Sequence, residues 1–227
     1  MKTQTVSKTN KTMTQAMKAT AAALLATAAV LGVGHAAEAK AKATGPAAGN
    51  YALDPMHSSV GFEIPHLVVS TVEGKFKVFE GTVDVQPDFA KSKLSATVDI
   101  GSIDTGTEKR DDHLKSPDFF DAKKFAKMTF VSTAIKGKPE SFKLEGDLTI
   151  RDQKKKVTFD AKYLGAVKDG YGNEKIAFRA TTKINRKDFG LTWNSVVEAG
   201  PVVGDEVTIE LKIQAAKVKQ EVKAAAK

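Results

Sequence analysis

The sequence contains no cysteine, so the folded chain must hold together without disulfides. Histidine is also scarce, and His57, His66 and His113, the histidines beyond the N-terminal segment, lack the HxH or HExxH spacing of metal sites. No G-x-S-x-G motif surrounds a serine, which argues against a hydrolase. We therefore expect no enzyme activity, no metal and no cofactor, and interpret the histidines as structural hydrogen-bonding groups.

The sequence also lacks an apolar run long enough to span a membrane comfortably, because residues 19–33 fall short of the roughly 20 residues that a span needs. Four lysines between residues 2 and 18 precede this run, and Ala37-Glu38-Ala39 follows it with the pattern of a signal peptidase site. We predict a signal peptide over residues 1–39, with cleavage after Ala36 as a second choice, and a periplasmic mature protein. An uncleaved anchor is the less favoured interpretation.

Removing residues 1–39 takes away four lysines and one glutamate, which lowers the formal net charge from +8 to +5. The remaining lysines are spread along the chain among acidic residues, and Lys154-Lys155-Lys156 is expected to form a hairpin turn. Without a helix-turn-helix pattern, this distribution predicts no nucleic-acid binding. We expect the basic tail, residues 216–227, to be disordered, and leave open its transient contact with an anionic membrane surface. The sequence also leaves homodimerisation open.

Residues 40–49 are small and aperiodic, and we predict a flexible linker there. Residues 50–215 then form one domain in which apolar and polar residues alternate, as in Leu94, Ala96, Val98 and Ile100. Eight or nine such segments, joined by turns, favour an all-β fold: a closed, up-and-down antiparallel β-barrel. A two-sheet sandwich is the competing architecture, which the length of several strands disfavours.

One segment, residues 102–121, breaks the strand pattern and predicts a short helix near residues 107–115. Thr105 or Thr107 can cap its beginning, acidic residues follow in the first turn, and Pro117 prevents continuation.

Several short motifs follow one another along the domain. They are Asp54-Pro55-Met56-His57-Ser58, Pro65-His66-Leu67, Gly74-Lys75-Phe76, Ile103-Asp104-Thr105, Lys109-Arg110-Asp111-Asp112-His113-Leu114, Asp118-Phe119-Phe120-Asp121, Gly146-Asp147-Leu148-Thr149-Ile150, Arg186-Lys187-Asp188-Phe189-Gly190-Leu191 and Val203-Gly204-Asp205-Glu206-Val207. With these motifs the chain resembles the YceI family of exported, lipocalin-like, polyisoprenoid-binding proteins. Ala126 and Asp152 depart from the family pattern at turns. The resemblance implies an extended, eight-stranded, antiparallel, lipocalin-like β-barrel whose apolar interior holds an isoprenoid or another long-chain lipid.

The expected ligand-binding residues are apolar side chains on the inward faces of the strands. Because each CH₂-sized group removed from water contributes about 0.8 kcal/mol, such a lining can bind a lipophile with few hydrogen bonds. A solid core without a ligand is the alternative interpretation of the same residues. The candidates are Phe62, Phe76, Val98, Phe130, Leu148, Phe159, Phe178 and Ile209.

A small polar cluster, Arg110 with Asp111 and His113, could receive the head group of an amphipathic lipid, because a guanidinium pairs well with phosphate or carboxylate oxygens. An internal Arg110–Asp111 pair that pins the helix explains the same residues. Trp193 is a candidate for the cavity mouth or for packing at one end of the barrel. The expected ligand is a polyisoprenoid, an isoprenoid quinone or a similar lipid, with a fatty-acid derivative or a foreign lipophile as alternatives.

Overall fold

The computed structural model describes residues 45–67, 69–197 and 200–219 of the chain. The predicted signal peptide, the first five residues of the predicted linker and residues 220–227 of the predicted tail lie outside this part. No helix among the described residues has the length and apolarity needed to cross a membrane.

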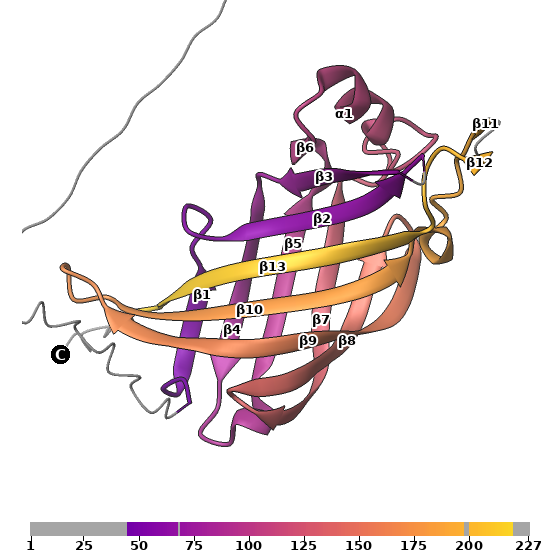
Figure 1. Ribbon diagram of the computed structural model, residues 1–227. Helices are drawn as coiled ribbons and strands as arrows, with labels where there is room; N and C mark the ends of the chain where they lie inside the picture. The colour runs from indigo at the N-terminus through magenta and orange to yellow at the C-terminus, as the bar shows by residue number, and fades with distance from the viewer. Residues whose placement is uncertain (1–44, 68, 198–199, 220–227) are drawn as a thin grey trace, which may run out of the picture. The chain divides into compact units, whose positions relative to one another are not determined.

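The prediction of an eight-stranded antiparallel β-barrel is confirmed (Figure 1). The barrel strands follow the order β1-β4-β5-β7-β8-β9-β10-β13, and β13 closes the ring by pairing with β1. These strands are β1 (Gly49–Leu53), β4 (Phe79–Val85), β5 (Lys93–Asp99), β7 (Lys127–Lys138), β8 (Ser141–Ile150), β9 (Gln153–Lys168), β10 (Glu174–Asn185) and β13 (Glu206–Lys217).

The remaining elements gather mostly at one end of the barrel. A hairpin of β2 and β3 pairs with the first half of β13, and the two-residue strand β6 pairs with β3. A second, smaller hairpin joins β11 to β12. The bounds are β2 (Ser59–His66), β3 (Ser70–Phe76), β6 (Ile103–Asp104), α1 (Glu108–Lys115), β11 (Val196–Val197), β12 (Gly200–Pro201) and the 3₁₀ turns η1 (Phe89–Lys91), η2 (Ile100–Ser102) and η3 (Arg186–Phe189).

Strands β1 and β13 extend slightly beyond the predicted limits of the domain, residues 50–215. Strand β1 already begins at Gly49, the last residue of the predicted linker, and pairs there with Val85. Strand β13 continues through Ala216 and Lys217, which the sequence assigned to the tail, because these residues pair with β1. At the C-terminal end, the pairing that closes the ring therefore runs two residues past the predicted limit.

The prediction that Lys154-Lys155-Lys156 forms a turn is wrong. These lysines lie in β9 and pair with Thr149, Leu148 and Asp147 of β8, and the turn falls earlier, at Arg151 and Asp152. Arg151 adopts a left-handed backbone conformation with φ of 57°. The side chains of all three lysines are exposed, so the strand accommodates them without burying a charge.

The short helix is confirmed as α1, but its capping differs from the prediction. Thr107 occupies the N-cap position, yet its side chain makes no capping hydrogen bond among the described residues. The Thr105 hydroxyl donates instead to Asp111. At the other end, the backbone N–H and the hydroxyl of Ser116 both donate to the carbonyl of His113, which terminates the helix just before Pro117.

Along one of its edges, strand β13 pairs first with β2, over residues 208–212, and then with β1, over residues 215–217. The change of partner falls near Gln214. The connection between β1 and β2 fixes this change. The Ser58 hydroxyl donates to the Gln214 carbonyl and accepts from the Gln214 N–H. The Asp54 carboxylate accepts from the Gln214 side chain at 3.0 Å and lies 2.8 Å from Nδ1 of His57. The Asp54–Ser58 motif therefore holds the point where the barrel closes.

We expect Asp54→Asn to lower the free energy of unfolding by about 1.5–3 kcal/mol at neutral pH, since hydrogen bonds to charged groups contribute that much. Burial raises the pKa of Asp54, but hydrogen bonds from His57 and Gln214 outweigh burial and hold the pKa below its ordinary value. The stabilisation is therefore fully present above the unfolded-state pKa of about 3.9 and is lost as the pH falls through the lower folded-state pKa.

Urea unfolding of the wild type and the variant across pH 2–7 measures this difference. Asp188→Asn is the control, because Asp188 is exposed and its side chain makes no hydrogen bond or ion pair within the described part of the chain. A gap between wild type and Asp54→Asn that stays constant down to pH 2 would contradict the assignment.

Candidate ligand-binding cavity

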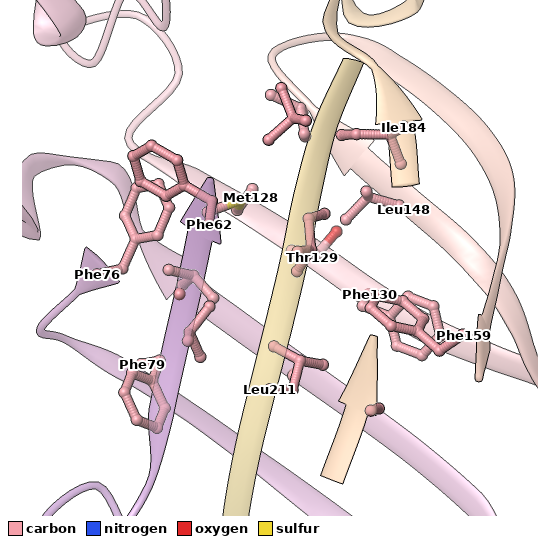
Figure 2. A pocket seen from close by; sticks show the side chains of 18 of the residues that line it. Phe62, Phe76, Phe79, Met128, Thr129, Phe130, Leu148, Phe159, Ile184 and Leu211 are labelled. Atoms are coloured by element: carbon pink, nitrogen blue, oxygen red, sulfur yellow. The ribbon is translucent and has the colours of Figure 1, made fainter. Parts of the chain in front are cut away.

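The inward faces of the strands enclose a cavity of about 360 Å³. This volume falls within the range of small-molecule sites, roughly 300–1,000 Å³. Its wall is almost entirely apolar. Figure 2 shows Phe62, Phe76 and Phe79 on one side of the cavity and Phe130, Phe159 and Leu148 on the other. The barrel interior is thus lined with hydrophobic side chains but incompletely filled.

Two glycines allow phenylalanine rings to lie against the wall. A Cβ atom at Gly74 would lie 2.3 Å from Cζ of Phe62, and a Cβ atom at Gly146 would lie 2.3 Å from Cζ of Phe130. Each ring therefore covers bare backbone of the neighbouring strand. Both glycines belong to the motifs singled out in the sequence, and their lack of a side chain gives the rings room beside the cavity.

Of the twelve predicted ligand-binding residues, eleven lie in the wall of this cavity. Their contact with a ligand remains a prediction. Five are buried: Phe76, Val98, Phe130, Leu148 and Phe159. The other six are partly exposed: Phe62, Arg110, His113, Phe178, Trp193 and Ile209.

Asp111 is the predicted residue that lies outside the wall. Its Oδ1 accepts hydrogen bonds from the backbone N–H of Thr105 at 2.9 Å and from the Thr105 hydroxyl at 2.5 Å. Arg110 binds the same threonine, with Nε 2.7 Å from the hydroxyl oxygen and Nη2 2.7 Å from the carbonyl oxygen. Both charged residues therefore pin α1 to Thr105, and the two are linked through that residue rather than by direct contact.

His113 stands in an aromatic cluster at the α1 end of the barrel. Its ring packs edge-on against Phe119 and Trp193, with centroid distances of 5.0 and 4.8 Å. Nε2 of His113 lies 2.9 Å from the Asp118 carboxylate, which fixes the orientation of the ring. Trp193 thus both packs at the barrel end and lines the cavity, so the two interpretations of this residue describe one arrangement.

Arg186 is a residue of the cavity wall that sequence reasoning did not select. Its side chain is only 2% exposed, and its guanidinium donates to the carbonyl oxygens of Gly204, Leu191 and Trp193 at 2.6–2.8 Å. Burial lowers the pKa of Arg186, while Asp205, 3.4 Å away, acts in the opposite direction. Its position in the motif Arg186-Lys187-Asp188 was visible in the sequence, but nothing there indicated a buried guanidinium.

The two ends of the barrel differ. The end away from α1 is closed by a buried cluster, Tyr51, Val83, Val85, Tyr163, Ile176 and Ala215. At the α1 end the wall passes into partly exposed residues, among them Ile64, His66, Trp193, Val202 and Val203. We call this end the mouth. Among the described residues, no three acidic or histidine side chains gather where they could hold a metal ion.

Comparisons with known proteins agree with this architecture. A family model described as a YceI-like domain matches residues 51–215. A UPF0312 protein of Staphylococcus aureus is 40% identical over 164 residues, which cover 71% of this chain and 94% of that protein. The crystal structure of a Campylobacter jejuni YCEI protein is 36% identical, has a TM-score of 0.60 and covers 74% of this chain and 97% of its own.

A more distant structure shares the fold. It is a polyisoprenoid binding domain from Saccharophagus degradans that is implicated in plant cell wall breakdown. It is 14% identical, has a TM-score of 0.57, and covers 74% of this chain and 98% of its own.

Proposed function

Because the chain belongs to the YceI-like family, we propose that it is a periplasmic binding protein that carries a long-chain lipophile in its barrel. The ligand is a polyisoprenoid, an isoprenoid quinone or a molecule of similar chemistry. The observation that carries this proposal is the apolar cavity, which the barrel strands enclose together with the β2–β3 hairpin and which phenylalanine and aliphatic side chains line. The polyisoprenoid-binding neighbour of the same fold supports the choice of ligand class.

The energetics favour an apolar ligand. Each CH₂-sized group that leaves water for the cavity contributes about 0.8 kcal/mol, and the wall offers few hydrogen-bonding groups that could orient a polar molecule. Arg110 and His113 lie in the wall near the mouth, so they are placed to meet a polar head group while the chain lies deeper. We assign the protein no catalytic step and no cofactor, and the predicted signal peptide supports export to the periplasm.

The direct test is native mass spectrometry of the protein purified from the periplasm, followed by organic extraction. We expect a co-purifying lipophile and a mature N-terminus near residue 40. The control is Leu211→Trp, which adds an aromatic side chain to the cavity wall and should exclude the ligand while the barrel remains folded.

If neither extraction nor titration with isoprenoids, quinones and fatty acyl chains reveals binding, the barrel is a structural one without a ligand. An extracted fatty-acid derivative or foreign lipophile would keep the carrier function and change its substrate class. An intact Met1 would overturn the assignment to the periplasm.

A further inference from the structure

Three valines project into solvent at the mouth of the barrel. Val69 is 89% exposed, Val196 is 80% exposed and Val197 is 44% exposed. Val69 lies in the turn between β2 and β3, and the other two form β11. We call these three side chains the valine lip. In Figure 1 the β11–β12 hairpin projects beyond the end of β13, beside the turn between β2 and β3.

Hydrogen bonds join the two loops that carry the valine lip. The backbone N–H of Leu67 donates to the carbonyl of Val202 at 2.9 Å, and His66 forms an isolated β-bridge with Val203. The N–H of Val202 donates in turn to the carbonyl of Ser195 at 2.9 Å. The valines therefore stand on two loops whose backbones are hydrogen-bonded to each other.

The loops around the valine lip are depleted of charge. Residues 65–72 and 189–197 contain no aspartate, glutamate, lysine or arginine, although such residues make up 27% of the chain. Glu198, between the two strands of the small hairpin, is the one charged residue in the sequence from 189 to 204. An exposed apolar edge with few charged neighbours in the sequence suits hydrocarbon, since charged residues are the costliest to bring to a membrane interior.

Exposed valines elsewhere lie in different surroundings. Val131 pairs with Asp147 across strands β7 and β8, and Val167 pairs with Lys175 across strands β9 and β10. Those valines are single apolar side chains on a charged wall, which is ordinary for a protein surface. The valine lip differs because its valines lie in two joined loops whose stretches 65–72 and 189–197 contain no charged residue.

The lip is also continuous with the cavity. His66, Val202 and Val203 belong to the joined loops and line the cavity at the same time, and Trp193 extends that lining inward. A molecule crossing the lip would therefore meet a mostly apolar wall that leads to the interior, with Arg110 and His113 as its polar members near the mouth. This continuity favours a lipid surface over a protein as the occupant of the lip.

We propose that the valine lip is a membrane-docking surface, which inserts into the outer part of a phospholipid bilayer and turns the mouth towards its hydrocarbon. The proposal rests on the proposed carrier function, because a lipophilic cargo resides in membranes. The attraction comes from burial of apolar surface rather than from charge. Docking therefore needs no anionic lipid and depends little on salt.

The test measures binding of the mature protein to phosphatidylcholine vesicles by flotation. We expect wild-type protein to float with the vesicles at both 0.05 and 0.5 M salt, values chosen to span about a threefold change in Debye length. The triple variant Val69→Ser, Val196→Ser, Val197→Ser should weaken binding roughly tenfold or more. The control variant Val78→Ser, Val131→Ser, Val167→Ser changes three other exposed valines and should bind like the wild type.

A second measurement separates docking from cargo binding: uptake of a fluorescent geranylgeraniol derivative presented in solution without vesicles. The lip variant should keep this uptake, which also shows that its barrel is folded. Uptake by a wild type that does not bind vesicles overturns the docking surface and leaves the carrier function intact. Vesicle binding that depends on the valine lip, in a protein that takes up no probe, overturns the carrier function and leaves the docking surface intact.

Two further outcomes would overturn the proposal. Vesicle binding that requires anionic lipid, disappears at high salt and survives in the lip variant would assign the contact to charge, as in the basic tail. A change of oligomeric state in the lip variant, with unchanged vesicle binding, would make the lip an interface between protein copies.

Discussion

Replacing Arg186 with leucine should lower the free energy of unfolding by about 3–5 kcal/mol, among the largest effects of any single substitution in this chain. The guanidinium is 2% exposed and donates to three backbone carbonyls, those of Gly204, Leu191 and Trp193. A leucine matches part of the volume but leaves these buried acceptors without a donor, and each buried unsatisfied group costs about 1–3 kcal/mol. The loss also releases the segment that places Trp193 at the mouth.

Chemical unfolding with guanidinium chloride, followed by far-UV circular dichroism, measures the effect. Arg179→Leu is the matched control, because Arg179 is exposed and stands between Lys162 and Lys212 on the neighbouring strands. Removing the central one of these three cations should change the free energy of unfolding by no more than about 0.5 kcal/mol, or raise it slightly. A loss below about 1 kcal/mol in Arg186→Leu would show that water satisfies the carbonyls and that the guanidinium is dispensable.

The second large effect concerns ligand affinity. Phe62→Ser and Phe178→Ser should each weaken lipophile binding by about 10–100-fold, because each removes a large apolar side chain from the wall and leaves a hydroxyl facing the ligand. That range corresponds to roughly 1.4–2.8 kcal/mol. Arg110→Ala should cost only a few-fold, since two of its donors are already engaged by Thr105 and burial of the chain supplies most of the affinity.

Fluorescence titration with the same isoprenoid probe compares the three variants at a temperature where all remain folded. Phe125→Ser is the control, because Phe125 lies outside the cavity wall and packs near the Lys124 and Arg151 side chains. If Arg110→Ala abolishes binding while both phenylalanine variants bind almost normally, head-group capture is the main interaction and the apolar wall is secondary.

Local sequence patterns determined much of this architecture. Alternation of apolar and polar residues specifies which side chains of a strand face inward, because successive side chains point to opposite faces, and it placed Phe76, Val98 and Phe159 in the interior. The break in that alternation and the position of Pro117 likewise located α1. These rules depend on residues near one another in the chain, so one sequence suffices to apply them.

Other features were decided by contacts between residues far apart in the chain. Whether the barrel is filled or hollow depends on how Phe62 and Phe130 lie over Gly74 and Gly146, and on the cluster around Tyr51 that closes one end only. The total volume of the inward-facing side chains determines whether a cavity remains, and the pattern within a single strand does not give that total.

Polar side chains show the same division. Asp111 and Arg110 are neighbours on one helix, and the sequence offered a ligand site or a direct pair; the fold brought Thr105 between them. Nothing in the sequence distinguished Arg186 from an exposed cation; its role follows from the hydrogen bonds that its guanidinium donates to the carbonyls of Leu191, Trp193 and Gly204. Charge and hydrogen-bonding capacity are properties of the residue, whereas burial and partner are properties of the assembled chain, so only the tertiary structure assigned these roles.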